Sequence, residues 1–119
     1  MNETIVPALL MVRTDLDPAG EEEFNTWYTN VHLPEIVAVA GVRWGKRYRV
    51  RRDDASYPSD ESIQTYLAIY GLESADVLRS EEFLSRRGWS KEIAPMVLNT
   101  TVTIYEELAA LSHPSDGES

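Results

Sequence analysis

Two segments of this chain alternate apolar residues on both of their faces, and they constrain the fold more than any other feature of the sequence. In the first, from Ile5 to Asp15, one face of a strand would carry Val6, Ala8, Leu10 and Val12, and the other Ile5, Pro7, Leu9 and Met11. In the second, from Gln64 to Leu72, the two faces would carry Tyr66, Ala68 and Tyr70, and Leu67 and Ile69. Strands with two apolar faces must be covered on both sides, so we expect both in the centre of a sheet.

Two helical regions are predicted between the strands. Asp17 and Pro18 are typical of the N-cap and first position of a helix. The large side chains that follow at helical spacing would face the sheet: Phe24, Trp27, Tyr28 and Val31. Pro34 is expected to end or bend this helix. In the second region Ser74 and Ser80 can each cap a helical turn.

The other two strands have less symmetric patterns. From Val42 to about Arg52, apolar residues fall on one face and mainly cations on the other: Val42, Trp44, Tyr48 and Val50 against Arg43, Gly45, Arg47, Arg49 and Arg51. Such one-sided burial is typical of an edge strand, and its apolar face should look toward the helices. The polar residues 53–62 would form an exposed hairpin loop. The last strand, Asn99 to Leu108, is rich in β-branched residues.

The order strand, helix, strand, strand, helix, strand predicts a ferredoxin-like βαββαβ fold of class α+β, with the first and third strands central in a four-stranded antiparallel sheet. The 119 residues suffice for one domain, which we place at residues 1–111, with a disordered polar tail at 112–119. Two short helices cover only one face of such a sheet. We therefore predict a homodimer in which the sheet of a second copy covers the other face.

The net charge of −9 argues against nucleic acid and membrane surfaces as partners, because both are anionic. No apolar run is long enough to cross a bilayer, and the N-terminal residues lack the pattern of a signal peptide. Cysteine is absent, which fits a reducing compartment, so we expect a cytoplasmic protein. The basic residues of segment 43–52 form either a solvated strand edge or a surface that steers a small anionic substrate.

One stretch of the sequence resembles a known family. It is similar to the signature region of EthD-like members of the dimeric α+β barrel superfamily, in the residues Phe24-x-x-Trp27-Tyr28-x-x-Val31-His32-Leu33-Pro34-Glu35 and Gly41-x-x-x-Gly45-x-Arg47-Tyr48. The resemblance implies two sheets that pair into a barrel across a dimer, and a small ligand held between sheet and helices. Superfamily members include monooxygenases, polyketide cyclases, lactone isomerases, haem-degrading enzymes and proteins without known activity, so the resemblance indicates no single reaction.

The same resemblance matches His32 to the histidine of the family's HLPE stretch, and Tyr28 precedes it by one helical turn. We expect an aromatic pocket in which further substrate-binding residues are Trp44, Tyr48, Tyr66 and Tyr70. His32 could exchange a proton with a carbon acid there while tyrosine hydroxyls hold the developing oxyanion. The alternative is a structural His32 that hydrogen-bonds the backbone where the helix ends.

We predict neither a metal nor any other cofactor. His32 and Glu35 offer at most two nearby ligands, whereas a stable metal site usually has three or four. No glycine-rich nucleotide loop or nucleophile elbow is present. Haem-degrading members arrange an asparagine, a tryptophan and a histidine differently from Asn25, Trp27 and His32. The cyclases use a second histidine on a strand, whereas the other histidine here, His113, falls in the predicted tail.

Three functions therefore remain open. The first is a cofactor-independent enzyme that carries out isomerase- or cyclase-type proton transfer on a small aromatic or carbonyl-containing metabolite, with His32 as acid and base. The second is a cofactor-free monooxygenase, in which the pocket stabilises a substrate carbanion that reacts with oxygen. The third is a non-catalytic dimer that binds a ligand or a partner protein.

Overall fold

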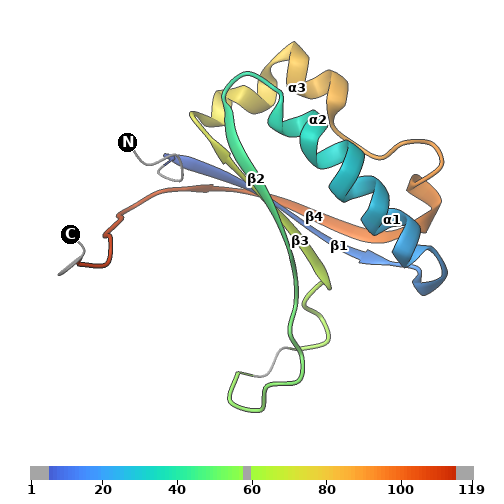
Figure 1. The fold of residues 1–119 in the computed structure, drawn as a ribbon. Helices are drawn as coiled ribbons and strands as arrows, with labels where there is room; N and C mark the ends of the chain where they lie inside the picture. The colour runs from blue at the N-terminus through green and yellow to red at the C-terminus, as the bar shows by residue number, and fades with distance from the viewer. Residues whose placement is uncertain (1–5, 58–59, 115–119) are drawn as a thin grey trace.

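The structure is a computed structural model that describes residues 6–57 and 60–114 (Figure 1). Its strands are β1 (Ala8–Leu16), β2 (Val42–Arg49), β3 (Tyr66–Leu72) and β4 (Val97–Glu106). The first helical region contains the 3-10 turn η1 (Pro18–Gly20), α1 (Glu21–Trp27), the π-helical turn η2 (Tyr28–His32) and α2 (Leu33–Val37). The second contains η3 (Ala75–Arg79), α3 (Glu81–Arg86) and η4 (Ala94–Met96).

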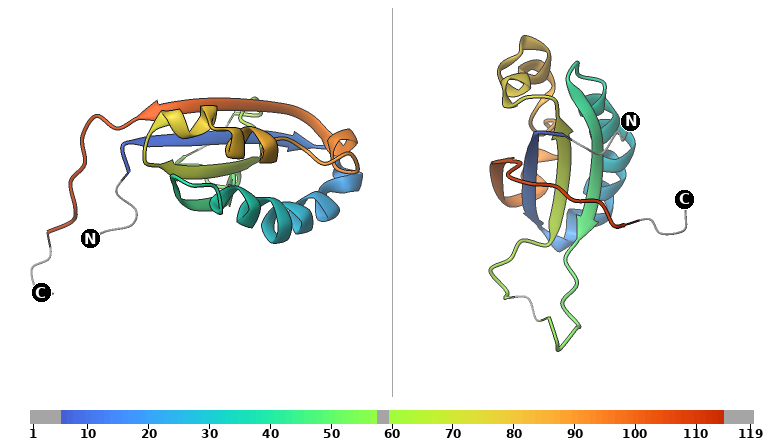
Figure 2. Two further views of the ribbon diagram at one scale, coloured as in Figure 1. Left: turned by 90° about the horizontal axis from the view of Figure 1, so that it is seen from above. Right: turned by 90° about the vertical axis from the view of Figure 1, so that its left-hand side faces the viewer.

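The four strands form one antiparallel sheet in the order β2-β3-β1-β4. The predicted central strands, β1 and β3, are confirmed, as is the edge position of β2. Figure 2 shows the strands side by side, from orange β4 through blue β1 and olive β3 to green β2, with the helices on one face of the sheet. The protein thus has the predicted ferredoxin-like α+β fold. The segment between β2 and β3 extends away from the sheet as a long hairpin loop (Figure 1).

The predicted helix caps are all formed. The Asp17 carboxylate accepts a hydrogen bond from the Ala19 N–H at 3.0 Å, which fixes the start of the first helical region. In the second region the Ser80 hydroxyl oxygen accepts from the Phe83 N–H at 3.1 Å. Ser74 caps η3 in the same way. Each cap satisfies a backbone donor that has no partner inside its helix.

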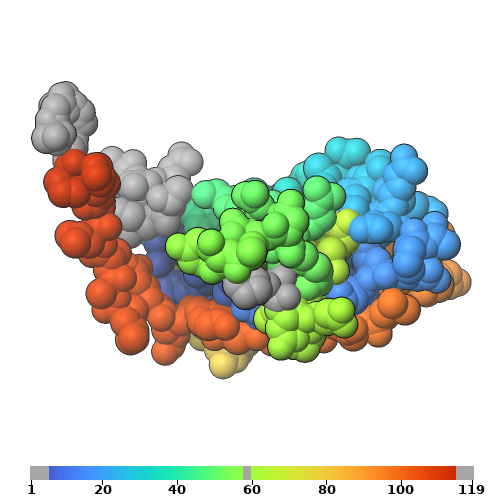
Figure 3. Space-filling model, turned by 90° about the horizontal axis from the view of Figure 1, so that it is seen from below, coloured from blue at the N-terminus to red at the C-terminus, as the bar shows by residue number. Residues whose placement is uncertain are grey.

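The main core lies between the sheet and the helices. Its most deeply buried large side chains are Tyr70, Phe24, Leu72, Ile93 and Val39. On the opposite face of the central strands, Leu9, Met11, Leu67 and Ile69 are only half-buried. The edge strand β4 leaves Leu98, Val102, Ile104 and Tyr105 exposed. In the space-filling view β4 and the segment after it form one long orange edge of the molecule (Figure 3).

The face assignment predicted for β2 is wrong beyond its first residue, because a bulge at Arg43 shifts the register. Val42 pairs with Leu72, but Trp44 pairs with the adjacent Gly71, so two residues of β2 span one step of β3. Every later residue therefore changes sides. Gly45 and Arg47, opposite Tyr70 and Ala68, face the helices. Trp44 and Tyr48 face the other way.

The first helical region does not end at Pro34. The chain turns on through η2 into α2, and the two helices form one nearly continuous rod (Figure 1). The Leu33 N–H bonds to the Tyr28 carbonyl five residues earlier, so a wide turn precedes the proline, which has no N–H of its own. The wide turn also changes which side chains of the first helical region are buried. Val31, predicted to face the sheet, is 51% exposed, and His32 is buried in its place.

Residues 107–114 follow β4 without regular secondary structure and are exposed. The predicted tail thus lies partly outside the described residues, which end at 114. No helix among residues 6–57 and 60–114 is both long enough and apolar enough to cross a membrane.

The close approach of α2 to β2 at Gly45 gives a testable prediction. A Cβ at this position would lie 2.8 Å from Val37 Cγ2 and 3.0 Å from both Leu33 Cδ1 and Tyr70 Cδ1. We expect Gly45→Ala to lower the free energy of unfolding by about 1–3 kcal/mol through overpacking, measured by urea denaturation. In a Val37→Ala background, Gly45→Ala should lower the free energy of unfolding by less, because the nearest side-chain atom has been removed. Equal stability of Gly45→Ala and the parent would contradict this packing.

Candidate active site

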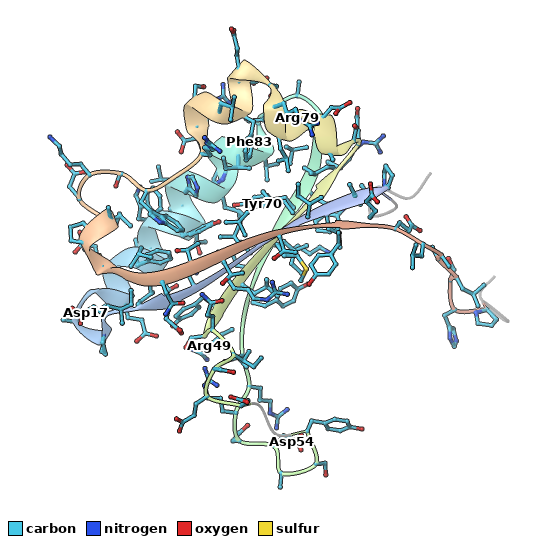
Figure 4. All side chains as sticks on the ribbon, turned by 180° about the vertical axis from the view of Figure 1, so that it is seen from behind. Asp17, Arg49, Asp54, Tyr70, Arg79 and Phe83 are labelled. Atoms are coloured by element: carbon cyan, nitrogen blue, oxygen red, sulfur yellow. The ribbon has the colours of Figure 1, made fainter. Side chains whose placement is uncertain are left out.

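A cavity of about 650 Å³ lies between the sheet and the two helical regions. Its walls come from β1, β3, β4, the first helical region, α3 and the segment after α3; they include Leu10, Val12, Tyr28, His32, Ile36, Tyr70, Phe83, Arg87, Trp89, Val102 and Ile104. Tyr70 and Phe83 approach it from opposite sides, from the sheet and from α3 (Figure 4). Most of these side chains are apolar, as is usual for sites that bind small molecules.

His32 is the only histidine in this wall and is 5% exposed. Its ring stacks on the indole of Trp27, with centroids 4.7 Å apart and planes 14° apart. The phenol ring of Tyr28 meets the imidazole edge-on at 4.9 Å. The π-helical turn explains the stack, because residues five apart in an α-helix are separated by about 140° around the axis. The wider turn brings Trp27 and His32 onto one side.

The environment of His32 favours a neutral ring with a defined tautomer. Burial lowers its pKa below the ordinary 6.5, while the hydrogen bond and charge of Glu35 partly oppose this shift. His32 Nδ1 lies 3.3 Å from Glu35 Oε1. A carboxylate can only accept, so Nδ1 carries the proton and Nε2 keeps its lone pair. The ring can therefore act as a proton acceptor through Nε2.

A pair of tyrosine hydroxyls lies in the same cavity wall. Tyr28 Oη and Tyr70 Oη are 2.8 Å apart, one on the helix and one on β3. Burial raises the pKa of both hydroxyls above the ordinary 10.0, and for Tyr70 the neighbouring Tyr28 adds to the increase. Both therefore stay protonated at neutral pH. Because one hydroxyl donates to the other, the pair retains one O–H that can donate to a ligand oxygen.

Arg47 lies beside this pair and under α1. Its guanidinium is 4.6 Å above the Tyr28 ring and donates to Asn25 Oδ1 at 2.9 Å and Thr29 Oγ1 at 3.1 Å. Burial lowers its pKa from the ordinary 12.5, and the surrounding tyrosines oppose this change. Tyr66 also lies here, where its hydroxyl contacts Asn25. A half-buried cation next to the tyrosine pair favours negative charge at the tyrosine oxygens.

The predicted site residues fall into three groups. Tyr28, His32 and Tyr70 meet around one cavity. Tyr66 shares the buried face of β3 but belongs to the Arg47 cluster outside the cavity lining. Trp44 and Tyr48 were placed on the helix-facing side of β2, which is incorrect because of the Arg43 bulge. Trp44 instead borders a second cavity of about 520 Å³, which is lined by residues of β1, β2, β4 and the segment after β4, and Tyr48 is 50% exposed.

Several residues of the site were missed by the sequence reasoning. Trp27 was expected only to face the sheet, but it stacks on His32. Trp89, which was not among the predicted site residues, lines the cavity. Arg47 was placed on the face of β2 that points away from the helices. Gly45 was the available signal, because an interior strand glycine often marks close approach of another backbone. Placing Gly45 toward the helix also places Arg47 there.

Among residues 6–57 and 60–114, no group of three or more histidine, cysteine, aspartate or glutamate side chains could hold a metal ion. His32 and Glu35 form a pair only. His113 is exposed and lies outside both cavities. Two histidines acting on one substrate within a protomer therefore do not fit this arrangement.

The lowered pKa of His32 predicts a pH-dependent stability. The unfolded chain binds a proton at this residue more readily than the folded chain, so stability should fall as pH drops below about 6.5. We expect His32→Gln, which cannot titrate, to lose less unfolding free energy than the parent between pH 7.5 and pH 5. The measurement is urea denaturation at both pH values. His113→Gln should behave like the parent, and identical pH dependence in all three proteins would refute a buried neutral His32.

Comparisons with known proteins identify solved structures with a similar fold. Neither models of protein families nor curated proteins match the sequence. Solved structures do match. An EthD family protein from Bacillus halodurans is 18% identical, with a TM-score of 0.62 over 87% of this chain and 100% of that one. The haem degrader MhuD from Mycobacterium tuberculosis, solved with two haems in its active site, is 9% identical, with a TM-score of 0.63 over 89% and 100%.

A third similar structure is from Nitrosomonas europaea and is provisionally named an antibiotic biosynthesis monooxygenase. It is 14% identical, with a TM-score of 0.57 over 86% of this chain and 99% of that one. Identities this low establish a shared fold and leave the reaction open. The resemblance found in the sequence is thus confirmed by structure: the chain has the ferredoxin-like α+β fold of an EthD family protein.

Proposed function

We propose that the 650 Å³ cavity binds a small aromatic or carbonyl-containing metabolite, and that His32 moves a proton on it as acid and base. The observation that carries the proposal is that one apolar cavity wall contains both His32 and the Tyr28–Tyr70 hydroxyl pair. A neutral imidazole has its Nε2 unprotonated, and a tyrosine pair has one O–H to donate. Proton removal from carbon requires both a base and a donor for the oxygen that becomes negative.

The proposed step begins with Nε2 of His32 taking a proton from the carbon next to a carbonyl group. The electron pair of the C–H bond moves toward the carbonyl oxygen, which becomes an enolate oxygen held by the free O–H of the Tyr28–Tyr70 pair. The imidazolium then returns the proton to a different carbon or to the enolate oxygen, which completes an isomerisation. In a cyclisation the enolate carbon instead bonds to a second carbonyl carbon of the same molecule, and the oxygen of that carbonyl takes the proton from the imidazolium. Arg47 stabilises the negative charge from behind the tyrosines.

The aromatic wall supports this role of His32. Trp27 stacks on the ring, and Trp89 lies with its centroid 6.1 Å from it. Both keep water from the imidazole, which holds its pKa low and the free base populated at neutral pH. The Glu35 contact fixes the tautomer and would stabilise the imidazolium that forms during the step.

A second candidate is a cofactor-free monooxygenase, favoured by the fold similarity to the protein provisionally named a monooxygenase. Its first step would be the same proton removal. The substrate carbanion would then reduce molecular oxygen and bond to it, and the resulting hydroperoxide would lose water to leave a new carbonyl group. The two candidates differ in one observable. A monooxygenase consumes oxygen in proportion to substrate, whereas an isomerase or cyclase consumes none.

The proton-transfer proposal can be tested without knowing the natural substrate. We expect the protein to accelerate deuterium exchange at the acidic carbon of 2-tetralone, an aromatic ketone, followed by proton NMR in D₂O. His32→Gln should reduce the acceleration by about 10²-fold or more, because general base catalysis is lost. The acceleration should also decline toward acidic pH, with a midpoint below the ordinary histidine pKa of 6.5.

His113→Gln is the matched control, since it removes the exposed histidine and should leave exchange unchanged. Undiminished exchange in a folded His32→Gln protein would remove His32 from the chemistry. Binding of 2-tetralone without faster exchange would instead favour the non-catalytic alternative.

We further propose that the protein is a homodimer whose copies pack through the sheet face opposite the helices. That face carries half-buried apolar side chains from both central strands, among them Met11, Leu67 and Ile69. Contiguous apolar surfaces of this kind are usually covered in soluble proteins. A second copy of this chain can cover the face without a different partner protein. A two-fold axis would place this face of one protomer against the same face of the other.

The dimer proposal predicts twice the chain mass of 13.5 kDa in light scattering after size-exclusion chromatography. We expect Ile69→Glu to shift the protein to monomer, because it puts a charge in the centre of the face. The control is Ile63→Glu, in the exposed hairpin loop, which should remain dimeric. A parent protein that stays monomeric at micromolar concentration would overturn the proposal.

A further inference from the structure

The cavity wall contains one permanently charged side chain, that of Arg87. The other titratable residues lining the cavity are His32, Tyr28 and Tyr70, each held neutral by burial. No aspartate or glutamate is among the lining residues. In a chain with a net charge of −9, the cavity therefore differs sharply from the average surface.

Arg87 has no partner for its charge within the described residues. The neighbouring Arg86, by contrast, donates a hydrogen bond to the Glu35 carbonyl at 3.3 Å and forms an ion pair with Glu82 at 3.5 Å. No side-chain hydrogen bond or ion pair holds the guanidinium of Arg87 among residues 6–57 and 60–114. The backbone bends at the next residue, Gly88, whose φ of 95° lies in the left-handed region. Arg87 thus sits at the exposed rim, between α3 and Trp89.

The residues on either side of Arg87 connect this part of the chain to the surroundings of His32. The Arg86 bond to Glu35 ties the end of α3 to the first turn of α2, the same turn whose Glu35 contacts His32. The ring centroid of Trp89, two residues after Arg87, lies 6.1 Å from that of His32. The cation and the proposed base therefore belong to one end of the cavity.

We propose that the ligand is an aromatic or otherwise apolar molecule with a single acidic group, a carboxylate or sulfonate, which Arg87 binds at the rim while the apolar body fills the cavity. The inference rests on the proposed function of the cavity and names the substrate class. A guanidinium recognises such groups through two parallel N–H donors. An apolar cavity with one cation at its edge selects a molecule that is apolar at one end and anionic at the other.

Two fluorescent probes with the same ring system separate charge from shape. 8-Anilinonaphthalene-1-sulfonate carries a sulfonate, and N-phenyl-1-naphthylamine is its uncharged counterpart. We expect Arg87→Gln to weaken the sulfonate probe by about 5-fold or more and the neutral probe by less than about 2-fold. The sulfonate affinity should fall with added NaCl in the parent protein only. Arg51→Gln, which removes the same charge from the hairpin loop, is the control and should change neither affinity.

A third variant tests whether the two probes bind inside the cavity. Val102 lines the cavity and is 60% exposed, so Val102→Trp should obstruct the cavity without disturbing the core. Leu98→Trp, at an exposed β4 position outside the cavity lining, should not. If Val102→Trp weakens both probes while Arg87→Gln changes neither, the cavity binds ligands but the acidic-group inference is wrong. If Val102→Trp leaves both probes unaffected, the cavity is not a binding site, and the proposed function fails together with the inference.

Discussion

The imidazole of His32 stacks on the indole of Trp27, and the rest of the site depends on the widened helical turn that makes this contact possible. In a regular α-helix the two rings would point in different directions, and Val31 would occupy the buried position. The π-helical turn at Tyr28–His32 reverses this, so His32 enters the apolar wall and Val31 faces outward. Pro34, which lacks an N–H, follows directly, and one wide turn thus accommodates a helix-breaking residue and positions the site.

The chemistry follows from burial combined with a few specific contacts. An apolar wall alone would make His32 neutral, but it would not decide which nitrogen is free; the Glu35 carboxylate does this by occupying Nδ1. Burial likewise keeps Tyr28 and Tyr70 protonated, and their mutual hydrogen bond leaves one O–H unused. The two permanent cations differ in role: Arg47 lies behind the tyrosines, whereas Arg87 lies at the rim where a ligand would enter.

The sequence predicted the fold well because hydrophobic periodicity records which strands are covered on both faces. The apolar patterns of β1 and β3 identified the sheet centre, and Ser74, Ser80 and Asp17 cap helical turns as expected. The site was predicted only in part, because one-residue irregularities change side-chain directions without changing composition. The bulge at Arg43 moved Trp44 and Tyr48 off the helix-facing side and brought Arg47 in, and the π-helical turn exchanged Val31 for His32.

The proposed chemistry requires that His32 is a neutral imidazole at pH 7 with its proton on Nδ1 and its lone pair on Nε2. Two-bond ¹H–¹⁵N correlation NMR of the full chain measures both properties directly, with His32→Gln used to assign the signals. We expect an Nδ1–H tautomer at pH 7 and protonation only below the ordinary pKa of 6.5. An Nε2–H tautomer, or an imidazolium at pH 7, would contradict it, since neither form leaves Nε2 free to accept a proton.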